Sequence, residues 1–290
     1  MRARMAFSGV VGVIVLCAPA IAQAPAPRGS FGGGGLVAPP RDHFGPGNAV
    51  VALRAMRGGR LELEGTVRGR CGGGEFAATA RLADDGSFRA KGRQRTEPER
   101  GVTVRTSYEV TGTFSSATAA DGVLKATIQR TSEGRTRRCR SGTVRFGLRR
   151  PNGRIGAPGA PGGARYYGTT SQRGVGPHRP IVLRVSGDGR VISRALFGES
   201  VRCSDRTRMV GVEAPRTNAR ISRSGLIDDR ERFTISSDTT LVRVDDRFTG
   251  RLGATGGRGT LSLSDRTFDR ATGNVIRSCR SGTVRWRAAR

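Results

Sequence analysis

Apolar residues fall at every second position along much of the chain. Val102, Val104, Tyr108 and Val110 share one parity, and the same spacing recurs over 144–149 and 181–186. A period of two turns one face of a strand towards a core and the other towards water, as in an antiparallel sheet. No segment keeps the 3.6-residue period of an amphipathic helix. The pattern therefore predicts an all-β protein.

Three Asp-Gly pairs punctuate these alternating runs: Asp85-Gly86, Asp121-Gly122 and Asp188-Gly189. Glycine adopts the positive φ angles that tight hairpin turns require. We therefore expect a hairpin turn at each pair.

An internal repeat divides the chain. Residues Arg138–Phe146 recur as Ser278–Trp286, and the seven residues that begin at Cys139 are identical to the seven that begin at Cys279. Upstream, 60–71 resembles 190–203. Self-similarity of this kind is typical of a duplication, so the sequence predicts two copies of one β-module.

Gly/Pro-rich segments flank the predicted modules. Residues 29–47 and 151–163 are rich in Gly and Pro, a composition that buries too little apolar surface to order itself. Each module is expected to be an antiparallel β-sandwich or small barrel. The expected order is a signal peptide at 1–22, a disordered segment at 23–47, a first module at 48–150, a flexible linker at 151–163 and a second module at 164–290.

The start of the chain predicts export. Arg2 and Arg4 precede an apolar run, Met5–Ala18, which is followed by the small-x-small pattern Ala20-Ile21-Ala22. This is the layout of a signal peptide, with cleavage expected after Ala22. The apolar run is short for a membrane anchor, and no later stretch is long and apolar enough to span a bilayer.

Cleavage would leave four cysteines: Cys71, Cys139, Cys203 and Cys279. An even number of cysteines in an exported chain indicates disulfides. Because equivalent positions of a repeat make equivalent bonds, we expect the pairs Cys71–Cys139 and Cys203–Cys279. Each would close a loop long enough to contribute roughly 4 kcal/mol in the chain-entropy account.

The second copy begins with Tyr166-Tyr167-Gly168-Thr169-Thr170 and closes with Cys279-Arg280-Ser281-Gly282 and Trp286. These motifs resemble an uncharacterised secreted β-module that recurs in high-GC bacteria. The resemblance implies export and a β fold, and it implies no activity. The first copy is expected to be divergent, without the opening motif and with Phe146 in place of the closing tryptophan.

The chain is strongly basic, with 51 Lys+Arg against 23 Asp+Glu and a formal net charge of +28; Lys91 and Lys125 are its only lysines. Such charge favours anionic partners. The charge is spread over both copies and aromatic residues make up only 5%, so no specific nucleic-acid recognition is expected. Anionic cell-surface polymers are the expected partners, if the charge is functional rather than compositional.

The densest basic run comprises Arg135, Arg137, Arg138 and Arg140. It is a candidate anion-binding edge. The alternative is a solvated strand whose charges discourage edge-to-edge aggregation. The second copy keeps few of these arginines, which favours the alternative.

The sequence gives little support for a catalytic site or a bound cofactor. The chain has two histidines and no Cys-x-x-Cys spacing, so no metal and no cofactor are expected. Ser141 and Ser281 lack the context of a nucleophile elbow. The acidic pairs, such as Asp245-Asp246, are expected to be turns or arginine partners. Trp286 is expected to fill a core rather than to bind sugar rings.

The sequence thus predicts an exported, non-enzymatic binding or structural module of the cell envelope or extracellular space. Two alternatives stay open: a nonspecific polyanion-binding protein, or a glycan-directed hydrolase whose carboxylates the sequence does not identify.

Overall fold

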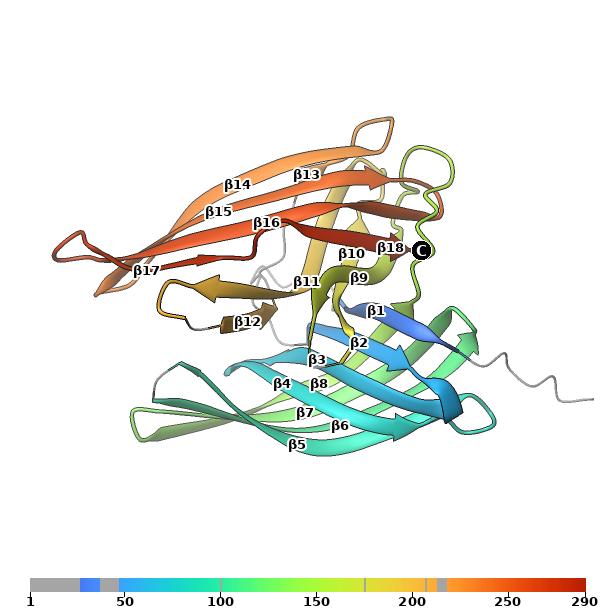
Figure 1. Cartoon of the computed structure of the whole chain (residues 1–290), viewed down its shortest axis with the longest axis horizontal. Coiled ribbons are helices and arrows are strands. Elements are labelled where there is room, and N and C mark those ends of the chain that lie inside the picture. Colours follow the sequence, from blue (N-terminus) through green and yellow to red (C-terminus); the bar gives the residue numbers. More distant parts are fainter. Residues whose placement is uncertain (1–26, 37–46, 100, 175, 207, 213–217) are drawn as a thin grey trace, which may run out of the picture.

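The computed structural model describes residues 27–36, 47–99, 101–174, 176–206, 208–212 and 218–290. The expected signal peptide, residues 1–22, lies outside this part of the chain. The described residues are all-β apart from a short 3-10 turn at Arg57–Gly59. They fold into two curled antiparallel sheets, one a nearly closed barrel and the other a half-barrel (Figure 1). Within the described residues, no helix is long and apolar enough to cross a membrane.

The first sheet contains eight strands: β1 (Gly29–Gly35), β2 (Ala49–Ala55), β3 (Arg60–Gly69), β4 (Gly72–Arg81), β5 (Ser87–Glu99), β6 (Val102–Ser116), β7 (Ala119–Ser132) and β8 (Arg135–Arg149). The second contains ten: β9 (Arg165–Arg173), β10 (His178–Val185), β11 (Val191–Cys203), β12 (Arg208–Val212), β13 (Ala219–Arg220), β14 (Leu226–Ser236), β15 (Thr240–Leu252), β16 (Gly256–Asp269), β17 (Val275–Arg280) and β18 (Val284–Ala289).

The two sheets share one topology. Their strand orders are β4-β3-β2-β1-β8-β7-β6-β5 and β12-β11-β10-β9-β18-β16-β15-β14. In each sheet the first strand lies beside the last, as β1 pairs with β8 and β9 with β18. The long strand β8 of the first copy corresponds to β17 and β18 of the second. The repeat in the sequence is therefore a repeat of the whole strand arrangement.

The first module begins earlier than expected. Residues 23–47 were expected to be disordered, yet Gly29–Gly35 forms β1, which lies between β2 and β8. A Cβ placed on Gly32 would lie 1.9 Å from the carbonyl oxygen of Gly168, and one on Gly34 would lie 2.1 Å from that of Ala49. Only glycine allows so close an approach of two backbones. Composition was misleading because this strand, apart from the buried Phe31, contributes backbone rather than side chains.

The first copy also carries a counterpart of the opening motif. The registers of β1 and β9 place Phe31 at the position of Tyr166 and Gly33 at that of Gly168. The Phe31 and Tyr166 side chains are both fully buried in their own sheets. The first copy lacks the sequence Tyr-x-Gly-Thr-Thr, but it keeps a strand at the equivalent place, with an aromatic residue two positions before a glycine.

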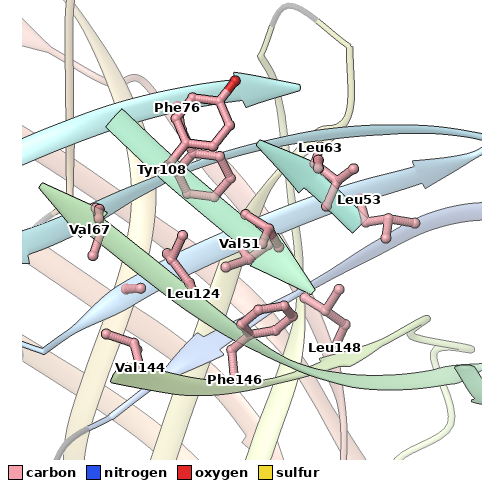
Figure 2. Packing of buried hydrophobic residues seen from close by; sticks show 14 of the residues in the cluster. Val51, Leu53, Leu63, Val67, Phe76, Tyr108, Leu124, Val144, Phe146 and Leu148 are labelled. Atoms are coloured by element: carbon pink, nitrogen blue, oxygen red, sulfur yellow. The ribbon is translucent and has the colours of Figure 1, made fainter. Parts of the chain in front are cut away.

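The alternation seen in the sequence builds the core. In the first module Val104, Tyr108 and Val110 point inwards, and the Tyr108 hydroxyl donates a hydrogen bond to the Ala77 carbonyl. Figure 2 shows Tyr108 beside Phe76, with aliphatic side chains from β2, β3, β7 and β8 completing the layer. Each buried side chain of this size contributes roughly 1.5–3 kcal/mol.

Two of the three expected turns are present. Gly86 and Gly189 adopt φ angles of 78° and 76° in the turns that follow Asp85 and Asp188. Asp121-Gly122 instead lies inside β7, and the β6–β7 turn falls at residues 117–118. A Cβ on Gly122 would lie 2.5 Å from the Phe146 ring, so packing rather than a turn requires this glycine.

The modules pack directly on one another. Leu36 and Val50 of the first contact Val182 and Leu196 of the second in a small buried cluster. The segment 151–163, expected to be a flexible linker, is hydrogen-bonded to the β15–β16 turn, through the Ala254 and Thr255 amides. The two modules therefore form one body rather than two units on a loose spacer.

Candidate anion-binding groove

Four cationic side chains line one groove on the outer face of the first sheet. Lys91, Arg93, Lys125 and Arg140 surround an open hollow of about 710 Å³ over β5 to β8. All four side chains are exposed. The groove contains both lysines of the chain. We call these residues the basic groove.

Strand register brings these residues together. Lys91, Glu109, Lys125 and Thr143 form one row across the four strands, and Arg93, Ser107, Thr127 and Arg140 form the next. Neighbouring strands lie roughly 4.8 Å apart, so the backbone positions of the two lysines are about 10 Å apart. The cations thus form a two-dimensional array rather than a single point charge.

The four cations of the basic groove outnumber its one acid, Glu109, which lies between the two lysines in the strand register. The acid among them, Glu109, binds Arg89 at 2.5 Å. Lys91, Arg93, Lys125 and Arg140 make no ion pair within the described residues. An exposed array of unpaired cations attracts phosphate, sulfate or carboxylate groups.

The structure divides the arginine run that the sequence singled out. Arg138 and Arg140 point to the outer face of β8, where Arg140 joins the basic groove. Arg137 shares the face of Cys139 and lies opposite Arg130, and Arg135 lies at the β7–β8 turn. The run is therefore no single edge, and alternation along the strand sends its members to two faces.

The second sheet has a hollow at the equivalent place, of about 410 Å³. The registers place Arg230 at the position of Lys91, Arg247 at that of Glu109 and Arg280 at that of Arg140. We call this hollow the paired groove. Both modules therefore present a groove to solvent over the same four strand positions.

Carboxylates pair with two of the three arginines that line the paired groove, Arg230 and Arg247. Arg230 donates to both carboxylate oxygens of Asp245, at 2.8 and 2.5 Å, and the Nε of Arg232 lies 3.2 Å from Asp245. These hydrogen bonds, that of Arg230 above all, lower the pKa of Asp245 to about 2. Arg247 pairs with Asp228 at 3.2 Å. The expectation that acidic pairs serve as arginine partners is confirmed for these two aspartates.

The identical motif that ends each repeat has a structural role. The Ser141 hydroxyl accepts a hydrogen bond from the Ala126 amide and donates one to the Gly142 carbonyl. Ser281 makes the same two bonds, to the Leu263 amide and its own neighbouring glycine. In both copies the serine supports a bulge, where the following glycine has a φ angle near 70°.

Disulfides and aromatic residues complete the frame beneath the grooves. Cys71–Cys139 and Cys203–Cys279 are formed, as the repeat predicted. Trp286 is 1% exposed and stacks on Phe248 at 5.2 Å between ring centroids, while its Nε1 donates to the Thr249 carbonyl. Trp286 is thus a core residue, which confirms the expectation drawn from Phe146.

Among the described residues, no group of three or more His, Cys, Asp or Glu side chains is placed to hold a metal ion. No protein family, curated protein or solved structure matches this chain. The resemblance to a secreted β-module therefore stays a prediction.

Proposed function

We propose that this protein is an exported, non-enzymatic binding protein of the cell envelope or extracellular space, and that its first module binds anionic polymers. The observation that carries the proposal is the basic groove, in which Lys91, Arg93, Lys125 and Arg140 face solvent without an acidic partner in the described residues. A polymer with repeated anionic groups matches an array of cations better than a small ligand does.

Export is supported by the two disulfides, which form and persist in oxidising compartments. The amino-terminal leader pattern agrees with this. The anionic polymers of the cell surface are then the partners that the protein meets. Recognition is expected to depend on charge density, because Tyr108, the aromatic residue beside the groove, is buried and offers no platform on which bases would stack.

The test is polymer binding by the chain from residue 23, compared with the double variant Lys91→Gln/Lys125→Gln. Binding to heparin, to duplex DNA and to a purified anionic cell-wall polymer is measured between 50 and 200 mM salt. Each lost phosphate contact lowers the salt slope for DNA by about 0.9. The double variant should therefore bind more weakly, with a DNA slope smaller by about 2.

The matched control is Arg230→Gln/Arg247→Gln, which removes the same net charge from the paired groove. Because both arginines already bind aspartates, this variant should keep most of the affinity. Equal losses in the two variants would show that net charge alone drives binding, and the proposal of a defined groove would then be rejected.

A further inference from the structure

The far end of the second sheet is a tip made by two hairpins. The turn between β14 and β15 and the turn between β16 and β17 end side by side, away from the centre of the molecule (Figure 1). The Arg270 amide donates to the Thr239 carbonyl, and its Nη1 donates to the Ser237 carbonyl, each at 3.0 Å. These bonds join the two turns into one preformed end.

Large apolar side chains stand exposed at this end. Phe233 is 41% exposed, Ile235 52%, and Val275 and Ile276 54% each. Partly exposed neighbours extend this set, so that the apolar tip comprises Phe233, Ile235, Leu241, Phe268, Val275 and Ile276. The registers place Phe233 and Ile235 on the face of Cys279, and Leu241 and Phe268 on the opposite face, so both faces of the tip carry apolar side chains. Monomeric soluble proteins seldom expose such a gathering unless it contacts another surface.

The first module shows that the fold does not require an apolar end. At the positions of the six apolar-tip residues it carries Gln94, Thr96, Thr103, Thr131, Arg135 and Thr136. The apolar residues are thus a property of the second copy alone.

Arginines surround the apolar tip. The Arg243 guanidinium lies over the Phe268 ring, 4.9 Å from its centroid. Arg266 lies opposite Arg243, while Arg270 is in the turn and Arg277 is on the other face. The turns also hold two acids, Asp238 and Asp269, and Asp269 accepts hydrogen bonds from its own turn. The net charge around the tip is positive.

We propose that the apolar tip inserts into the surface of a lipid bilayer that carries anionic headgroups. An apolar end bounded by arginines is the pattern of an interfacial membrane contact, because the side chains enter the acyl boundary while the guanidinium groups stay with the phosphates. Charge complementarity favours this partner over a second copy of the chain, since two tips placed together would bring like charges into contact.

The experiment is flotation of the chain from residue 23 with vesicles, which excludes the apolar run Met5–Ala18 from the measurement. Vesicles of phosphatidylcholine alone are compared with vesicles that contain one quarter phosphatidylglycerol. The salt is raised to 0.5 M, where exposed electrostatic contacts such as those of the basic groove are screened. Binding to the anionic vesicles should persist at this salt. Its complete loss would overturn the proposal.

The decisive variant is Phe233→Gln/Ile235→Thr/Ile276→Thr, which installs the residues of the first module. Vesicle affinity should fall on the order of a hundredfold, because three large apolar side chains no longer leave water. The control is Leu226→Thr. Leu226 is 53% exposed at the opposite end of β14, and its loss should leave affinity unchanged. Equal affinity of the triple variant and the wild type would reject the proposal.

A second readout does not depend on the stability of the triple variant. Phe233→Trp keeps an apolar side chain at the tip, and its fluorescence should shift to the blue on vesicle binding and be quenched by brominated lipid. Unchanged fluorescence would contradict insertion.

A tip-dependent dimer in sedimentation would identify a second copy as the occupant and also overturn the proposal. The variant Lys91→Gln/Lys125→Gln should still bind vesicles at 0.5 M salt, so this inference and the proposed function fail separately.

Discussion

The two modules share a frame but present different surfaces. Both have the same strand order, a disulfide that closes a similar loop and a serine that supports the bulge after the second cysteine. The first carries unpaired cations in its outer groove and a polar end. The second pairs two of its three groove arginines with aspartates and ends in exposed apolar residues. The two copies therefore share the features that stabilise the sheet and differ in the side chains that the sheet exposes to solvent.

The difference between the grooves comes from a few exchanges. Asp245 stands where the first module has Ser107, and Ser262 stands where it has Lys125. Each exchange lies on the outer face, where a side chain is not held by packing. Exposed positions tolerate substitution at small cost in stability, so the grooves could diverge while the cores stayed alike.

The largest expected effect tests the shared frame. Replacing Cys71 and Cys139 with alanine should lower the free energy of unfolding by about 4 kcal/mol, and replacing Cys203 and Cys279 should do the same. The loops span 68 and 76 residues, so the chain-entropy account predicts nearly equal losses. Urea titrations of the two double variants measure them. Losses that differ several-fold would show that the two disulfides do not contribute equally to stability.

A smaller effect is expected at the serines of the bulge. Ser141→Ala leaves the buried Ala126 amide without its acceptor and should cost about 2 kcal/mol. Ser281 is less buried than Ser141, so water reaches its site and Ser281→Ala should cost about 1 kcal/mol. Thermal unfolding of each variant, with the Thr143→Ala variant as a surface control, measures the order. The reverse order would contradict the assigned role of burial.

The smallest effect on stability, and the sharpest test of the groove comparison, comes from Asp245→Ser. This variant installs the residue of the first module and frees Arg230 and Arg232. Affinity for heparin should rise by about threefold to tenfold as the paired groove becomes an unpaired one. Unchanged affinity would show that pairing by Asp245 does not keep anions out of the second groove.

The same variant should also change how the stability of the protein depends on pH in acid. The pKa of Asp245 is lowered from 3.8 to about 2, so its carboxylate stabilises the folded state above pH 4 and this contribution is lost as the pH falls towards 2. Asp245→Ser should therefore flatten the fall in stability between pH 4 and pH 2. Denaturation curves over this range measure the change. A fall in stability as steep as that of the wild type would contradict the pairing of Asp245 with Arg230 and Arg232.

Much of the frame follows from the sequence. Alternation identified the strands that bury Val104 and Val110, and the repeat identified both disulfides. The sequence did not predict the strand Gly29–Gly35, because glycine leaves no pattern of apolar and polar side chains. Its packing against Gly168 is a contact between two backbones. Strand formation there depends on partners that are distant in sequence.

The basic groove could not be predicted from the sequence because register creates it. Lys91 and Arg140 lie 49 positions apart in the chain and meet only when four strands align. The run Arg135–Arg140 looked like a site because its charges are consecutive. In a strand, however, consecutive residues point to opposite faces, so neighbouring charges are divided between two faces, while strand register brings together charges that are distant in the sequence.

The placement of β1 determines when the first sheet can be completed during folding. Of the described strands of the first module, β1 is the first to be synthesised and its neighbour β8 is the last. Until β8 has been synthesised, β1 offers an open edge that invites pairing with other chains. Sheets closed by such distant contacts fold slowly. Each module therefore passes through a period after synthesis in which binding by a chaperone would raise its yield.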